Sequence, residues 1–260
     1  MSEQFEQQVA NHVEAAAKSY AKKKVKKAII SIIAVAIVFV LIVGIILVSL
    51  LVKAGKEGSG SANTDEAILQ EIISAQKEAG VTLPEDMDDP AYAWSEGRLV
   101  SINWSAYGVT GEISFDGLDM LSRLDIRDGS LTKIDIDENT ELTFLGIYGN
   151  QITEVDLSAN VKLDTIWCGM NPLTTLDVSG IETLKYLDCN NCELKEINVS
   201  GCTGLTQLFV YTNQLESVDI STCTNLQQFW CQDNLIKELD LSNNTLLTEE
   251  RYDESVEVTK

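Results

Sequence analysis

The sequence predicts an α/β solenoid, a stack of repeats that each add one strand to a parallel sheet, preceded by an N-terminal transmembrane helix. Two observations lead to this fold class. Leucine recurs every 21 residues, at positions 121, 142, 163, 184, 205 and 226. Nearer the N-terminus, residues 28–52 form an uncharged and almost wholly apolar run.

The apolar run reads "AIISIIAVAIVFVLIVGIILVSLLV". It is longer than the ~20 residues that a helix needs to cross a bilayer. It is also longer than the ~7–15-residue apolar core of a cleavable signal peptide. A buried helix of a soluble domain would not be apolar on every side over this length. We therefore expect residues 28–52 to form a transmembrane helix.

Charge on either side of this run predicts its orientation. Residues 1–27 carry six lysines against three glutamates, a net charge of +3, whereas only Lys53 and Lys56 lie close to the other end. The positive-inside rule then makes 1–27 a basic cytoplasmic leader of a single-pass cell-membrane protein, with the C-terminal part extracellular. The whole-chain net charge of −21 less the leader's +3 leaves −24 for residues 53–260. Such a segment repels nucleic acid, so we expect no nucleic-acid partner.

Between the membrane and the repeats, two segments are distinguished by composition. Residues 53–63, "KAGKEGSGSAN", are typical of a flexible linker. Residues 64–80, "TDEAILQEIISAQKEAG", predict a helix that Thr64 or Asp65 caps and Gly80 ends. With the acidic, proline-containing loop that follows, this helix makes residues 64–98 a cap region.

The repeats are best described by slots counted from the recurring leucine. Slots four, six, eleven, fourteen and sixteen are mostly apolar, slot nine is mostly Asn, and slot fifteen is Asp in five of six copies. A single repeat cannot bury its apolar side, so the copies must stack, and the alternation through slots three to seven predicts a strand. We expect about seven repeats over residues 99–247, the first a divergent copy that begins at Leu99, and an acidic C-terminal tail over 248–260.

The pattern Leu-x-x-Leu-x-Leu-x-x-Asn/Cys resembles the leucine-rich repeat family. The 21-residue length, second halves such as "LDLS", and Cys in slot six are similar to the short bacterial class of internalin-like surface proteins. The resemblance implies a parallel sheet on the concave side of the solenoid. It also implies a bacterial cell-surface protein, adhesive or receptor-like, that binds other proteins.

The stretch "LDCNNCELKEINVSGC" contains Cys189 and Cys192 at Cys-x-x-Cys spacing. The chain has one histidine, His12, in the leader, and no second cysteine pair, so we expect no metal site and no cofactor. Slots six and nine face the core, where cysteine packs as a small apolar residue. Cys202 and Cys223 occupy slot nineteen of adjacent rungs, and adjacent rungs are ~4.8 Å apart. This spacing allows a disulfide between the two residues, so a bridge is kept as an alternative to two free thiols.

Side chains in slots three, five and seven face away from the core, because side chains alternate along a strand. The six complete repeats hold eight aromatic residues, and seven are in these slots; the exception is Phe229. Exposed aromatic surfaces often mark binding sites, and Tyr, Trp and Arg dominate interfaces. The alternative is that the rings stack along neighbouring strands and stabilise the sheet. The candidate ligand-binding residues are Arg123, Arg127, Phe144, Tyr148, Trp167, Tyr186, Asp188, Asn190, Phe209, Tyr211, Gln228 and Trp230.

Small Gly146 and Gly169 beside Trp167 predict a shallow pocket on this face. We expect the face to bind a protein or peptide; a self-assembling structural subunit and a glycan binder are the alternatives. We do not expect an enzyme, since no exported histidine or phosphate-binding loop is present. The enzyme alternative is a glycosidase-like carboxylate pair that includes Asp125 or Asp188. The Asp column in slot fifteen could bind calcium or cap backbone N–H groups.

Overall fold

The computed structural model describes residues 64–260, which lie within one unit of the chain. The predicted leader (1–27), transmembrane helix (28–52) and linker (53–63) lie outside the described residues. Within residues 64–260, no helix has the length and apolar character that a membrane crossing requires.

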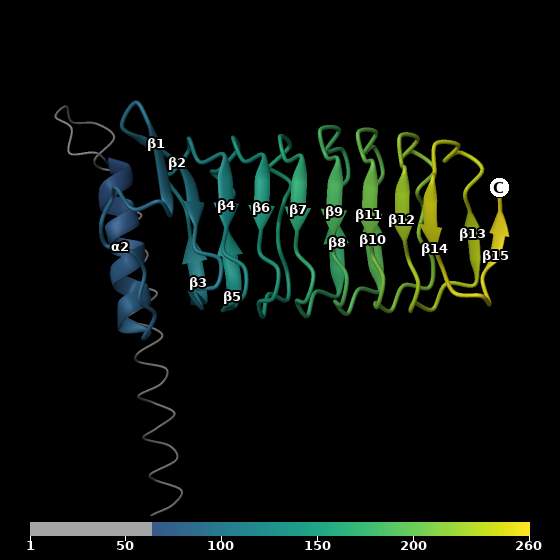
Figure 1. Ribbon diagram of the computed structural model, residues 1–260, viewed down its shortest axis with the longest axis horizontal. Helices are drawn as coiled ribbons and strands as arrows, with labels where there is room; N and C mark the ends of the chain where they lie inside the picture. The colour runs from purple at the N-terminus through teal and green to yellow at the C-terminus, as the bar shows by residue number, and fades with distance from the viewer. Residues whose placement is uncertain (1–63) are drawn as a thin grey trace, which may run out of the picture. The chain divides into compact units, whose positions relative to one another are not determined.

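Within residues 64–260, nine strands form one sheet, in which they follow each other in chain order (Figure 1). The β1–β2 hairpin is antiparallel and every other neighbouring pair in this sheet is parallel. The strands are β1 (Tyr92–Ser95), β2 (Arg98–Asn103), β4 (Arg123–Asp125), β6 (Phe144–Gly146), β7 (Thr165–Trp167), β9 (Tyr186–Asp188), β11 (Gln207–Phe209), β12 (Gln228–Trp230) and β14 (Glu249–Arg251). The predicted solenoid of parallel strands is therefore confirmed.

The register of this sheet repeats the period of the sequence. Leu124 stands beside Leu145, and Leu145 stands beside Ile166, each 21 residues further on. The opening repeat is one residue longer, because Ser101 stands beside Arg123. Residues that occupy the same slot in successive repeats thus form straight columns along the solenoid. The columns of slots one and four are fully buried and make the core.

Six further strands pair on the side of the repeats away from the nine-stranded sheet. They are β3 (Thr110–Ser114) with β5 (Ser130–Asp135), β8 (Thr175–Asp177) with β10 (Glu196–Asn198), and β13 (Glu238–Asp240) with β15 (Glu257–Thr259). The matching segments 154–156 and 217–219 are not strands, so the three pairs are separate.

Helix α2 (Thr64–Glu78) covers the N-terminal end of the stack through two buried polar side chains. Asp65 accepts hydrogen bonds from the backbone N–H of Leu99 at 2.8 Å and from Arg98 Nε at 3.0 Å. The Gln76 amide donates to the carbonyl of Thr110 at 2.9 Å and accepts from its N–H at 3.0 Å. These contacts satisfy backbone groups at the edge of the stack that would otherwise be buried without partners.

Asparagine in slot nine forms a ladder along the solenoid. Asn150 Nδ2 donates to the carbonyls of Ile126 and Ile147, both at 2.9 Å, while its Oδ1 accepts from the N–H of Leu131 at 3.0 Å. Asn171, Asn213 and Asn234 repeat the pattern one or more rungs along. The slot-nine column therefore has a structural role, because it joins the backbones of neighbouring rungs.

A second ladder in slot nineteen was not recognised from the sequence. Asn139, Asn160 and Asn244 are buried, and each donates Nδ2 to carbonyl groups of the preceding repeat. Cys202 and Cys223 stand in the same column, where their thiols donate to the carbonyls 24 residues earlier at 3.0 and 3.6 Å. Cysteine here replaces asparagine as the hydrogen-bond donor of the ladder.

All six cysteines are free thiols and buried, which confirms their expected place in the core. Burial raises the pKa of Cys192 and of Cys202 to about 12, so both thiols are protonated at neutral pH. Protonated, inward-facing thiols are poor nucleophiles and poor metal ligands. Cys202 and Cys223 are separate thiols here, and the bridge between them stays a prediction.

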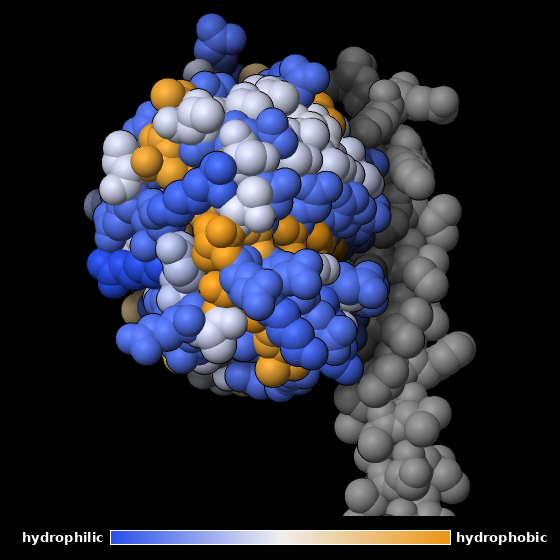
Figure 2. Space-filling view, turned by 90° about the vertical axis from the view of Figure 1, so that its right-hand side faces the viewer, coloured by the Kyte–Doolittle hydropathy of each residue, from blue (hydrophilic) through white to orange (hydrophobic). Residues whose placement is uncertain are grey.

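The stack continues past residue 247, where the sequence pattern places its end. Strand β14 pairs in register with β12, and β15 pairs with β13, so residues 249–259 add a further rung rather than a free acidic tail. The sequence pattern does not reveal this rung for two reasons. Glu250 occupies slot four, where the other copies have an apolar residue. The copy is also two residues shorter, since Glu257 stands beside Glu238, only 19 positions earlier. Figure 2 views this end of the stack and shows apolar surface in its middle with polar residues around it.

Candidate ligand-binding face of the sheet

The outer face of the nine-stranded sheet carries the side chains of slots three, five and seven. Because the register is constant, Phe144 stands beside Thr165 and Gly146 beside Trp167. All twelve predicted site residues belong to strands β4 to β12 or lie two positions after the end of one of these strands. We call this surface the outer face below.

Five aromatic rings form a continuous band along the outer face, mostly in edge-to-face contact. Neighbouring ring centroids are 5.1, 6.2, 5.5 and 4.7 Å apart, in the order Phe144, Trp167, Tyr186, Phe209 and Trp230. Tyr211 adds a contact with Trp230 at 6.2 Å. Each such aromatic pair contributes ~0.5–1.5 kcal/mol beyond the area that it buries. The band therefore stabilises the sheet, as the alternative interpretation expected.

Arginines cover both ends of this band. The guanidinium carbon of Arg123 lies 3.6 Å from the ring centroid of Phe144, and that of Arg127 lies 4.5 Å from the ring of Trp167. At the other end, Arg251 lies 3.9 Å from the ring of Trp230. These are cation–π distances.

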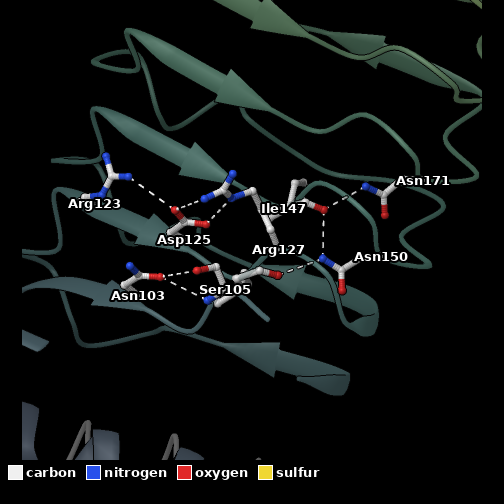
Figure 3. A network of polar contacts seen from close by, with 9 residues as sticks. Asn103, Ser105, Arg123, Asp125, Arg127, Ile147, Asn150 and Asn171 are labelled. Carbon is white, nitrogen blue, oxygen red and sulfur yellow. Dashed lines mark hydrogen bonds and ion pairs between the residues drawn. The ribbon is translucent and has the colours of Figure 1, made fainter. Parts of the chain in front are cut away.

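At the β4 end, Asp125 joins the two arginines into one network (Figure 3). Arg127 donates to both carboxylate oxygens of Asp125, at 2.7 and 2.9 Å, and Arg123 lies at 3.4 Å. The Asp125 side chain is 1% exposed. A buried carboxylate is stable there because the bidentate guanidinium compensates its charge.

The rings are less exposed than the sequence suggested. Phe144 and Phe209 are each 8% exposed, and Trp167, Tyr186 and Trp230 are half-buried. The outer face is thus a packed surface of ring edges and polar groups, not an open apolar patch.

The shallow pocket expected at Gly146 and Gly169 is absent from the described outer face. A Cβ on Gly146 would lie 2.9 Å from Asp125 Oδ1 and 3.0 Å from a ring carbon of Phe144. A Cβ on Gly169 would lie 2.9 Å from a ring carbon of Tyr148. These glycines allow neighbouring side chains to lie across the strand, and those side chains fill the space.

A carboxylate without a cationic partner lies at the centre of the outer face. Asp188 accepts hydrogen bonds from the backbone N–H of Asn190, at 3.1 Å, and from the Asn190 side chain. No lysine or arginine among residues 64–260 forms an ion pair with it. Burial raises the pKa of Asp188 above its ordinary value.

Three tyrosines share the outer face with this carboxylate. Burial raises the pKa of Tyr186 to about 12, and the charge of Asp188 adds to the effect. The pKa values of Tyr148 and Tyr211 are raised by the same two causes. The charge of Asp188 thus contributes to the raised pKa of three phenol groups on the outer face.

The β14 end of the outer face was missed by the sequence interpretation. Gln207, Gln228 and Glu249 form a row of side-chain hydrogen bonds across three strands. Glu249 also pairs with Arg251 at 2.8 Å. The missed residues lie 21 positions after Gln228 and Trp230, so extending the period by one copy would have found them. Asp125 was also left out of the candidate set, although slot five placed it on this face.

The opposite side of the solenoid has a hollow of about 550 Å³ beside segment 154–156. Its acidic lining residues are Asp135, Asp137, Glu154, Asp156 and Asp177.

The Asp column in slot fifteen borders this hollow. Asp156 and Asp177 each accept a hydrogen bond from the backbone N–H two residues further along the chain, which lowers the pKa of both carboxyls. Among residues 64–260, no group of three or more potential ligands is placed to hold a metal ion. The capping of backbone groups, one of the two roles considered for this column, is present at both residues.

The 21-residue turns, the parallel sheet and the asparagine ladder together define a leucine-rich-repeat solenoid with a cysteine ladder. Several solved structures are similar to it. The functional domain of the internalin InlJ from Listeria monocytogenes, described as including a cysteine ladder, is 22% identical with a TM-score of 0.42; 63% of this chain aligns with 48% of InlJ. The internalin InlF from the same organism is 20% identical with a TM-score of 0.45, covering 61% of this chain and 54% of InlF. The chain thus spans about half the length of these structures.

A third similar structure is the leucine-rich-repeat ectodomain of the plant membrane receptor kinase GASSHO1/SCHENGEN3 from Arabidopsis thaliana, in complex with CASPARIAN STRIP INTEGRITY FACTOR 2. It is 20% identical with a TM-score of 0.48, and 74% of this chain aligns with 30% of it. No protein-family model and no curated protein sequence matches the chain.

Proposed function

We propose that this protein is a membrane-anchored extracellular binding protein that recognises a protein or peptide partner through the outer face of its sheet. Residues 28–52 would anchor it, with residues 1–27 in the cytoplasm and the repeats outside. The observation that carries the proposal is the band of rings and arginines between Arg123 and Arg251, because Trp, Tyr and Arg are the residues that dominate protein interfaces. Its packed rings offer a preformed surface that loses little side-chain entropy on binding.

The outer face favours a protein or peptide over a glycan. Sugars stack on open ring faces, whereas arginines cover the rings of Phe144, Trp167 and Trp230. The same arginines and the row of glutamines offer many hydrogen-bond donors and acceptors, which suit a polypeptide.

The binding test is partner capture from surface extracts with the full-length chain. Alanine at Trp167, Tyr186 or Trp230 should reduce capture by tenfold or more, since central interface aromatics each contribute ~2 kcal/mol or more. The matched control is Val161→Ala, which truncates a side chain that is 54% exposed and lies beside the hollow on the opposite side. Circular dichroism of each variant checks that the solenoid is intact. Undiminished capture by all three aromatic variants would refute the proposal.

The topology is tested separately on intact cells. Added protease should digest the repeats and leave the leader protected by the membrane. Digestion of the leader with protected repeats would reverse the proposed orientation, and purification of the chain without detergent would argue against the anchor.

Self-assembly is the second candidate, because the C-terminal end of the stack shows apolar surface (Figure 2) and Leu246 is 50% exposed. Light scattering of the purified chain distinguishes the two. A mass of one chain supports a monomeric binder, and a concentration-dependent mass that Leu246→Glu lowers would favour assembly.

A further inference from the structure

The unpaired carboxylate at the centre of the outer face needs a physical explanation. Asp188 is half-buried among aromatic side chains and has no cationic partner in the described chain. Placing a charge in such surroundings costs free energy unless an opposite charge compensates it.

The protein itself shows how such a carboxylate is satisfied. Asp125 occupies slot five three repeats earlier, in the same column of the sheet as Asp188. It receives a bidentate guanidinium from Arg127, which also lies over the ring of Trp167. In the repeat of Asp188, the position that corresponds to Arg127 is Asn190, which supplies no charge.

Aromatic side chains stand beside Asp188, as a ring lies against Arg127 at the Asp125 pair, although the neighbours of Asp125 in its own column are Asn103 and Gly146. The neighbours of Asp188 along the column are Trp167 on one side and Phe209 on the other. Tyr186 stands on the same strand, and Tyr148 and Tyr211 lie on the same face of nearby rungs. Asp188 and the three tyrosines are half-buried rather than buried, so an incoming group can reach the carboxylate.

We propose that Asp188 receives a cationic side chain of the binding partner, preferentially an arginine, which stacks against the surrounding rings. This inference rests on the proposed function and specifies the chemistry of its partner. Arginine is preferred to lysine because a planar guanidinium can donate two hydrogen bonds to one carboxylate while its face contacts an aromatic ring. The outer face already uses that arrangement at Arg127.

The test is saturation-transfer NMR of the full-length chain with small probes. The probes are Nα-acetyl-arginine amide, Nα-acetyl-lysine amide and Nα-acetyl-citrulline amide, which is neutral but close to arginine in shape. We expect saturable binding in the order arginine, lysine, citrulline. Asp188→Asn should weaken the arginine probe at least tenfold, while the side chain at 188 keeps an oxygen that accepts from the N–H of Asn190.

The matched control is Asp156→Asn, which removes one negative charge on the opposite side of the solenoid. Asparagine already occupies the same slot at Asn198, so the fold tolerates it. This variant should bind the arginine probe as the unaltered chain does. Equal loss in both variants would reveal a general charge effect and would overturn the proposal, as would binding that does not discriminate arginine from citrulline.

The capture assay separates this inference from the function on which it rests. If Asp188→Asn captures partners normally while Trp167→Ala and Trp230→Ala do not, the outer face binds and only the cationic contact is wrong. If none of the three variants changes capture, the proposed function itself fails.

Discussion

Replacing Asn150 by alanine is expected to destabilise the protein strongly. The side chain is 1% exposed and makes three hydrogen bonds of 2.9–3.0 Å, two to carbonyls and one from a backbone N–H. At a net ~1 kcal/mol for each bond, their loss costs about 3 kcal/mol of unfolding free energy. For a domain of this size, that corresponds to a fall in melting temperature of roughly 6–12 °C.

The assay is thermal and urea denaturation of the full-length chain, followed by circular dichroism of the repeats. Gln151→Ala, which truncates an exposed neighbour, is the control and should be nearly neutral. The converse variant is Cys192→Asn, since Cys192 occupies the same slot with only weak thiol contacts at 3.6 Å. It should stabilise the protein. A loss below about 1 kcal/mol for Asn150→Ala would refute the view that this ladder holds the rungs together.

Three further predictions concern backbone strain, ionisation and thiols. Thr212 is β-branched and has a φ of 56°, a left-handed backbone conformation that glycine adopts without strain. Thr212→Gly should therefore raise the unfolding free energy by about 1 kcal/mol in thermal denaturation. A lower unfolding free energy in this variant would contradict the strain argument. Because burial raises the pKa of Asp188, its ionisation costs more in the folded than in the unfolded chain, and its contribution to stability falls as pH rises from 3.8 through the raised pKa. Asp188→Asn should therefore melt higher than the unaltered chain at neutral pH, with the difference vanishing towards pH 3. Titration of the denatured, unreduced protein should find six thiols. A count of four would reveal one disulfide, and peptide mapping would then show whether it joins Cys202 to Cys223.

The repeat period was sufficient to predict the parallel sheet, its register and the columns of the core. These follow from sequence because each rung repeats the same local pattern, so the positions of Leu145 or Cys189 are fixed once the slots are counted. The asparagines of slot nine are predictable for the same reason. The last rung was missed because Glu250 stands where the pattern requires an apolar residue.

The interior of the candidate site could not be predicted in the same way. The slots place Phe144 and Gly146 on the outer face but do not reveal that one ring covers the neighbouring glycine. The choice of partner for each side chain depends on rotamers and on contacts across several rungs. For this reason the Asp125–Arg127 pair and the helix contacts of Gln76 became evident only in three dimensions.

The most direct test of binding at the outer face is site-specific photo-cross-linking. A benzophenone amino acid in place of Tyr186 in the full-length chain should form an adduct with a partner in surface extracts after irradiation. The same amino acid in place of Val161, which lies beside the hollow on the opposite side, should form none. Adducts at position 161 but not at 186 would contradict binding at the outer face.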